Sequence, residues 1–241
     1  MVRLAIGLTA LVVLAGCGER AKSPAESGQA PPVAAATEAP VPELPAGTYK
    51  LDPAHASLLF RVDHLGFSKY TARFTDWDAQ MQLDPANPAT AQLTAEVRAR
   101  SLSLERPPAG FEDELRGPNW LDTGKYPAIT FKSTAVTPTG PRAAKLTGDL
   151  TLHGVTKPVV LNATFNGGYK GHEMDPNARV GFSATSTFNR SDFGVAYGVP
   201  APGTTMGVSD AVEVIIEAEF TGPPLAKAAA PAGSAAATPA E

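Results

Sequence analysis

The stretch LTGDLTLHGVTKPVVLNATF, residues 146–165, decides the fold of this chain. In residues 146–152 leucines and a glycine alternate with threonines and an aspartate, and residues 159–165 repeat this alternation. A period of two is typical of a β-strand that buries one face. His153-Gly154 lies between the two runs, where a turn is needed. The stretch therefore predicts an antiparallel hairpin.

The same alternation recurs along the chain. In residues 211–221, Val212, Val214 and Ile216 point one way, while Glu213 and Glu217 point the other. The other strands expected from this pattern are 57–62, 129–135, 146–152, 159–165 and 180–188, with less regular ones at 69–74, 79–83 and 92–98. The total is about eight strands separated by short turns, which favours an antiparallel sheet.

An antiparallel all-β domain of about eight strands protects its edges either by stacking two sheets or by closing into a barrel. The alternation alone allows both arrangements. The segment from Leu104 to Asp122 lacks a strand pattern, and within it residues 110–116 predict a short helix with acidic residues near its beginning. We expect this helix to cap one opening of the domain.

The N-terminus has the layout of a secretory signal peptide. Arg3 precedes an apolar or small stretch, residues 4–16, which is too short to span a bilayer. Leu14-Ala15-Gly16-Cys17, with the only cysteine of the chain, resembles the lipobox of bacterial lipoproteins. This resemblance implies cleavage before Cys17, acyl chains on it, and an anchored protein; Gly18 resembles the pattern sorted to the outer membrane. The alternative is an ordinary cleaved signal peptide with an incidental cysteine.

Composition divides the rest of the chain. Residues 18–46 and 223–241 are rich in Ala, Pro, Glu, Ser and Gly, and such segments bury too little surface to fold. We expect a signal peptide and lipobox at 1–17, a disordered tether at 18–46, one folded domain at 47–222 and a disordered tail at 223–241. With Cys17 acylated, no thiol is left for a disulfide, a metal or a nucleophile.

Five segments in sequence order resemble the YceI-like lipid-binding family, exported bacterial proteins associated with polyisoprenoid binding. They are YKLDPAHAS (49–57), FRVDHLGFS (60–68), LDTGKYPAITFKS (121–133), LTGDLTLHGVTKPV (146–159), and NRSDFG (189–194) followed by VSD (208–210). The resemblance implies a lipocalin-like antiparallel barrel that holds a long apolar chain. Trp120 and Leu121 stand where the family often has a Phe pair, which keeps the pocket wall apolar but changes its shape.

We predict the residues that contact the ligand from the apolar strand faces. Some of them are expected to pack against each other instead, as in any barrel. The candidates are Leu58, Phe60, Phe131, Leu150, Leu161, Phe182, Phe188 and Val214.

The four histidines show no spacing typical of a metal site, so we expect no metal and no cofactor. His55 and His64 flank one expected strand and are candidates for binding a polar head group; bonding to the backbone near a strand end is the simpler role. Arg190 and Asp192 have a structural interpretation as well, a packed ion pair and a turn. No nucleophile elbow, phosphate loop or pair of catalytic acids is present, so no catalytic residue is predicted.

The net charge of −4, with no cluster of Lys or Arg, argues against nucleic acid. The leading hypothesis is a non-enzymatic protein that binds, carries or sequesters an isoprenoid-like lipid, anchored by Cys17 to the outer membrane and facing the periplasm. The first alternative is an envelope interaction module with a filled barrel, whose loops 167–176 and 197–206 bind a protein. A second is a metal-assisted hydrolase that uses the histidines.

Overall fold

The structure is a computed structural model, and it describes residues 42–225. The expected signal peptide, Cys17, most of the tether and nearly all of the tail lie outside this range. Within it, none of the helices has the length and apolar character needed to cross a bilayer.

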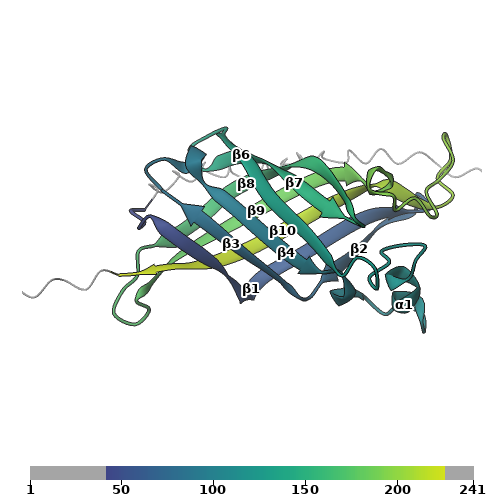
Figure 1. Ribbon diagram of the computed structural model, residues 1–241, viewed down its shortest axis with the longest axis horizontal. Helices are drawn as coiled ribbons and strands as arrows, with labels where there is room; N and C mark the ends of the chain where they lie inside the picture. Colours follow the sequence, from purple (N-terminus) through teal and green to yellow (C-terminus); the bar gives the residue numbers. More distant parts are fainter. Residues whose placement is uncertain (1–41, 226–241) are drawn as a thin grey trace, which may run out of the picture. The chain divides into compact units, whose positions relative to one another are not determined.

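The described residues form an antiparallel barrel (Figure 1). Eight strands close into a ring in the order β1-β10-β9-β8-β7-β6-β4-β3 and back to β1, while β2 and β5 extend the sheet beside β1. The all-β, antiparallel, eight-stranded barrel is thereby confirmed. The strands are β1 (Gly47–His64), β2 (Ser68–Phe74), β3 (Trp77–Leu83), β4 (Gln92–Arg98), β5 (Leu102–Leu104), β6 (Ala128–Pro138), β7 (Ala143–Leu152), β8 (Val155–Tyr169), β9 (Asn177–Asn189) and β10 (Val208–Pro224).

The expected hairpin is the pair β7–β8, in which Leu152 pairs with Val155. His153 and Gly154 between them have φ values of 52° and 74°. Two consecutive positive φ values are what a tight hairpin turn needs to match the twist of its strands, and glycine adopts them at little cost. The other expected strands are present too, whereas the short strand β5 was not predicted.

The segment between β5 and β6 contains the expected short helix, α1 (Phe111–Arg116), beside one end of the barrel (Figure 1). Glu112 accepts a hydrogen bond from the backbone N–H of Leu104, and Arg116 donates to the carbonyl of Leu102. These bonds hold α1 to β5. Three short 3-10 helices complete the description: η1 (Pro88–Thr90), η2 (Ala99–Ser101) and η3 (Arg190–Phe193).

The domain is slightly larger than the composition suggested. Leu44, inside the expected tether, packs against the buried cluster around Tyr49, and the Tyr49 hydroxyl donates to the carbonyl of Pro45. At the other terminus β10 reaches Pro224, which pairs with Asn177. A segment poor in large apolar residues can thus still be ordered where it borders a core.

Two buried clusters lie inside the barrel. One contains Tyr49, Val180 and Phe220, near the end where β1 begins, and the other contains Phe131, Leu161 and Phe193. Many inward-facing residues between them are only half buried. They are not exposed to the outside; instead they border the cavity described next.

Candidate functional site

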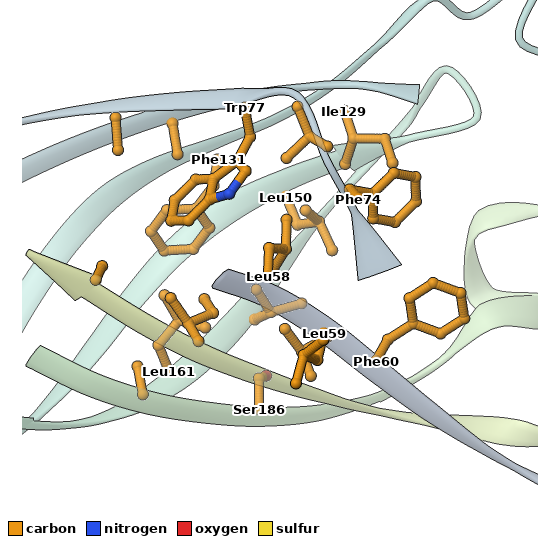
Figure 2. Close-up of a pocket in the computed structure, with 18 of the residues that line it drawn as sticks. Leu58, Leu59, Phe60, Phe74, Trp77, Ile129, Phe131, Leu150, Leu161 and Ser186 are labelled. Carbon is orange, nitrogen blue, oxygen red and sulfur yellow. The ribbon is translucent and has the colours of Figure 1, made fainter. Parts of the chain in front are cut away.

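A cavity of about 950 Å³ occupies the interior of the barrel. Ligand pockets span about 300–1,000 Å³, so this one is near the upper limit of that range. Its walls are the apolar faces of the strands, because alternate side chains of a strand point to the same face. Figure 2 shows part of this wall, with Leu58, Phe131 and Leu161 among the labelled side chains.

All eight residues predicted to contact a ligand line the cavity: Leu58, Phe60, Phe131, Leu150, Leu161, Phe182, Phe188 and Val214. Phe131 and Leu161 also belong to a buried cluster, so they pack against protein as well. Their contact with a ligand stays a prediction. The alternative of an envelope interaction module assumed a barrel filled by its own side chains, and the cavity contradicts that assumption.

Trp77 was missed by the sequence analysis and also lines the cavity (Figure 2). It is the first residue of β3, and Ala79, Met81 and Leu83 follow it on the same face. Extending the alternation of that strand by one step toward the N-terminus would have found it.

The lining residues reach both ends of the barrel. Leu44, Pro85 and Arg142 lie at the end where β1 begins, whereas Tyr70 and Arg106 lie at the end that carries α1. The Arg142 guanidinium lies 5.4 Å from the centre of the Phe165 ring and donates to the carbonyl of Asn166. Each end therefore has polar groups, and the wall between them is largely apolar, with Ser186 as a polar residue whose hydroxyl donates to the carbonyl of Val160.

Arg190, in η3 at the α1 end, is the most deeply buried charged residue of the wall, with 5% of its surface exposed. It was expected in a packed ion pair, but its hydrogen bonds go to four backbone carbonyls, at 2.8–2.9 Å: those of Val195, Tyr197, Val208 and Ser209. Burial lowers its pKa from the usual value. The guanidinium joins the loop after η3 to the start of β10.

Trp120 lies beside this guanidinium. Its ring centre is 5.3 Å from the Arg190 carbon and 5.3 Å from the ring centre of Tyr197. The indole Nε1 is buried from solvent and has no hydrogen-bond partner among residues 42–225. Trp120 also lines the cavity, as expected for a residue of the pocket wall.

The structure separates the two head-group candidates. His64, at the end of β1, lines the cavity near α1. His55 is not among the lining residues; its Nδ1 lies 3.0 Å from Asp52, and 60% of its side chain is exposed. His55 has the same parity along β1 as Ser57 and Arg61, so it points outward, whereas His64 has the parity of the inward residues Leu58 and Phe60.

His55 belongs instead to a polar cluster near the start of β1. Ligand atoms of Asp52, His55 and Glu219 lie within 4.8 Å of one another, as in a metal site. However, the Arg179 guanidinium donates to Asp52 at 2.6 Å, and a second cation beside it would be repelled. Hydrogen bonds from His55 and Arg179 lower the pKa of Asp52 to about 2.

The YceI-like domain family matches residues 49–220. Among curated relatives, a UPF0312 protein of Pseudomonas savastanoi pv. phaseolicola is 41% identical over 156 residues, which cover 65% of this chain and 77% of that protein. The chain belongs to the YceI-like family. A further member, UPF0312 protein PputW619_0484 of Pseudomonas putida, is 39% identical over 167 residues, covering 68% of this chain and 83% of that protein.

Several solved structures have a similar fold. The Campylobacter jejuni YCEI protein is 26% identical, with a TM-score of 0.56 and coverage of 67% of this chain and 90% of that one. Burkholderia cenocepacia BcnA is 24% identical, with a TM-score of 0.59 and coverage of 70% of this chain and 98% of that one. A polyisoprenoid binding domain from Saccharophagus degradans, implicated in plant cell wall breakdown, is 15% identical, with a TM-score of 0.52 and coverage of 73% of this chain and 98% of that one.

Proposed function

We propose that this protein binds and carries an apolar lipid of polyisoprenoid type, without catalysing a reaction on it. The observation that carries the proposal is the 950 Å³ cavity with its apolar strand faces. A long, narrow, apolar guest fits a cavity that extends between the two ends of a barrel. The polyisoprenoid binding domain of Saccharophagus degradans, which shares the fold, supports this choice of ligand class.

The energetics favour exchange with a membrane. Each five-carbon prenyl unit gains roughly 3 to 4 kcal/mol on leaving water, so a long chain would never dissociate into water. A bilayer, however, is as apolar as the cavity. The net affinity is then a small difference set by packing, head-group contacts and ordering costs, which allows the lipid to be taken up and returned.

The test is native mass spectrometry of protein purified gently, and of delipidated protein incubated with prenyl lipids. We expect one lipid per barrel. Leu150→Trp, which fills the cavity from β7, should reduce the occupied fraction at least about tenfold, since a bulky ring displaces the guest. Val160→Trp is the matched control, because Val160 on β8 is 41% exposed and outside this cavity. Barrels that stay empty with every prenyl lipid would refute the proposal.

The proposal also places the protein in the bacterial cell envelope, anchored through acylated Cys17 to the outer membrane and facing the periplasm. Two or three acyl chains hold a protein firmly, whereas one gives only marginal binding. Cys17→Ser is expected to release the protein from the membrane fraction. Retention of the variant in that fraction, or an unmodified Cys17 in the native protein, would contradict this anchor and leave the lipid-binding proposal standing.

A further inference from the structure

The ladder of backbone pairs between β8 and β9 ends before the strands do. Its last pair toward the α1 end is Asn162–Thr185, although β8 starts well before Asn162 and β9 continues well past Thr185. Over the remaining stretch β8 stays paired with β7, and β9 stays paired with β10. We call this stretch, residues 155–161 of β8 and 186–189 of β9, the seam. It is a part of the barrel wall where neighbouring strands share no ladder.

A proline explains part of this interruption. Pro158 lies in the seam and has no backbone N–H to donate. It has the same parity along β8 as Val160, whose carbonyl accepts the hydroxyl of Ser186 at 2.8 Å and therefore faces β9. Alternate residues of a strand direct their backbone groups to the same neighbour, so Pro158 removes a donor from the side that faces β9. A side-chain bond from Ser186 joins the strands instead.

A groove of about 470 Å³ follows the seam. It is lined by Pro158, Val159, Val160, Asn162, Thr185, Ser186, Thr187, Phe188 and Glu213. Val159, Ser186 and Phe188 border the large cavity as well, and Figure 2 shows Ser186 on its wall. The groove and the cavity are thus one residue apart. Because the ladder is interrupted here, side chains such as that of Ser186 fill the space between the strands.

The seam has a defined length. At one end it is bounded by the pair Asn162–Thr185. At the other end Lys157 on β8 lies 3.6 Å from Asp192 in η3, and both side chains are about half exposed. Such solvated ion pairs contribute little to stability. Between these two limits, the hydrogen bond from Ser186 crosses from β9 to β8.

We infer that the seam is a lateral entrance, where β8 and β9 part and the tail of the bound lipid passes sideways between the cavity and a membrane. This inference rests on the proposed function and adds a route to it. A sideways passage suits a long chain, which then need not be threaded along the whole barrel. An entrance sets the rate of uptake and not the occupancy at equilibrium, so Val160→Trp remains a control for occupancy.

The ends of the barrel are the competing routes. At the α1 end Phe111 and Leu115 line the cavity, so a guest entering there has to displace α1. At least three hydrogen bonds hold this helix, from Arg116 to the carbonyls of residues 100 and 102 and from the N–H of residue 104 to Glu112. Displacing α1 breaks more bonds than parting the seam. Entry at the opposite end requires the chain to pass lengthwise.

The first test loosens the seam. Delipidated protein is mixed with an excess of phosphatidylcholine vesicles carrying a dansyl-labelled prenyl lipid, and uptake is followed by energy transfer from Trp77 in the cavity wall. Ser186→Ala should raise the rate about three- to tenfold, the net contribution of one hydrogen bond. Ser183→Ala is the matched control, because Ser183 also bonds β8, through Asn166, but is itself paired in the ladder. Its rate should match that of wild type.

The second test locks the seam. With Cys17 replaced by serine, Val160→Cys and Thr187→Cys place one thiol on each strand, both outside the large cavity. Joining them with a short bismaleimide should slow uptake at least about tenfold, because the open state is no longer populated. The matched control joins Val160→Cys to Thr147→Cys on β7, its partner in a continuous ladder. Native mass spectrometry should find equal final occupancy in both bridged proteins.

The outcomes separate the two proposals. Unchanged uptake by the seam-bridged protein, or equal slowing by the control bridge, refutes the lateral entrance while lipid binding stands. If no protein of the series takes up lipid, the proposed function fails as well. Should the cysteine variants not fold or not bridge, the serine variants decide: a faster Ser186→Ala beside an unchanged Ser183→Ala supports the entrance, and equal rates refute it.

Discussion

Two arginines, one at each end of the barrel, are held in opposite ways. Arg179 on β9 donates to Asp175 at 2.7 Å and to Asp52 at 2.6 Å, outside the cavity. Arg190 at the α1 end is more deeply buried, and all four of its hydrogen bonds go to backbone carbonyls. Carboxylates raise the pKa of the first, whereas burial lowers the pKa of the second.

The difference separates an arginine held by carboxylate charges from one held by the dipoles of backbone carbonyls. Arg179 is charge-compensated by the carboxylates and joins β9 to β1. Arg190 joins a loop to β10 as well, but its hydrogen-bond partners are carbonyls without net charge, and the nearby charge of Asp210 offsets only part of the effect of burial on its pKa.

The largest expected effect is that of Arg190→Met. It leaves four carbonyls, of Val195, Tyr197, Val208 and Ser209, without their donor. Unpaired buried groups cost about 1–3 kcal/mol each, so the free energy of unfolding should fall by at least about 3 kcal/mol. The measurement is urea denaturation of the delipidated protein.

Arg179→Met is the matched control. Its side chain is 28% exposed, and partly solvated ion pairs contribute about 1 kcal/mol or less. If both variants lose the same free energy of unfolding, the four hydrogen bonds from Arg190 to carbonyls contribute no more than the ion pairs of Arg179.

The alternation of apolar residues predicted the strands because a strand that buries one face has an apolar residue at every second position. It did not reveal that β1 pairs with β10, because that contact joins the two ends of the domain in sequence and depends on the summed twist of all the strands. Strand β5, Leu102–Leu104, was missed because three residues cannot establish a period.

The apolar wall of the site was predictable for the same reason, and Trp120 was recognised as part of it. Arg190 was not, because its partners are backbone carbonyls of residues 195–209, and a carbonyl has no signature in a sequence. His55 was grouped with His64 because both flank one strand, although the alternation itself puts His55 on the outer face with Ser57 and His64 on the inner face.

An intermediate effect is expected for Gly168→Ala, beside Arg179. A Cβ on Gly168 would lie 2.4 Å from the carbonyl oxygen of Arg179, so the β8–β9 backbone must shift. Overpacking of this kind costs about 1–3 kcal/mol, more than the loss of the Arg179 ion pairs. Gly124→Ala is the control, because nothing lies within 4 Å of a Cβ there. A Gly168→Ala protein as stable as the control, by urea denaturation, would show that this backbone yields easily.

The smallest effect concerns acid stability at the Arg179 end. The folded-state pKa of Asp52 is lowered to about 2 by His55 and Arg179, whereas an unfolded aspartate titrates near about 4. A lowered pKa contributes stability that is complete above the unfolded value and is lost as pH falls through the folded value. Asp52→Asn should therefore destabilise the protein at pH 6, and the difference from wild type should shrink toward pH 2.

The same comparison in an Arg179→Met background isolates the contribution of the arginine. Removing Arg179 removes one of the two strongest causes of the pKa shift, so Asp52→Asn should there show a smaller dependence on pH. Urea denaturation at pH values from 2 to 6 measures all four proteins. If the dependence is unchanged without Arg179, the pair does not couple, and the contrast between an arginine held by carboxylates and one held by carbonyls loses its basis. If it disappears entirely, Arg179 rather than His55 dominates the stabilisation of the Asp52 carboxylate.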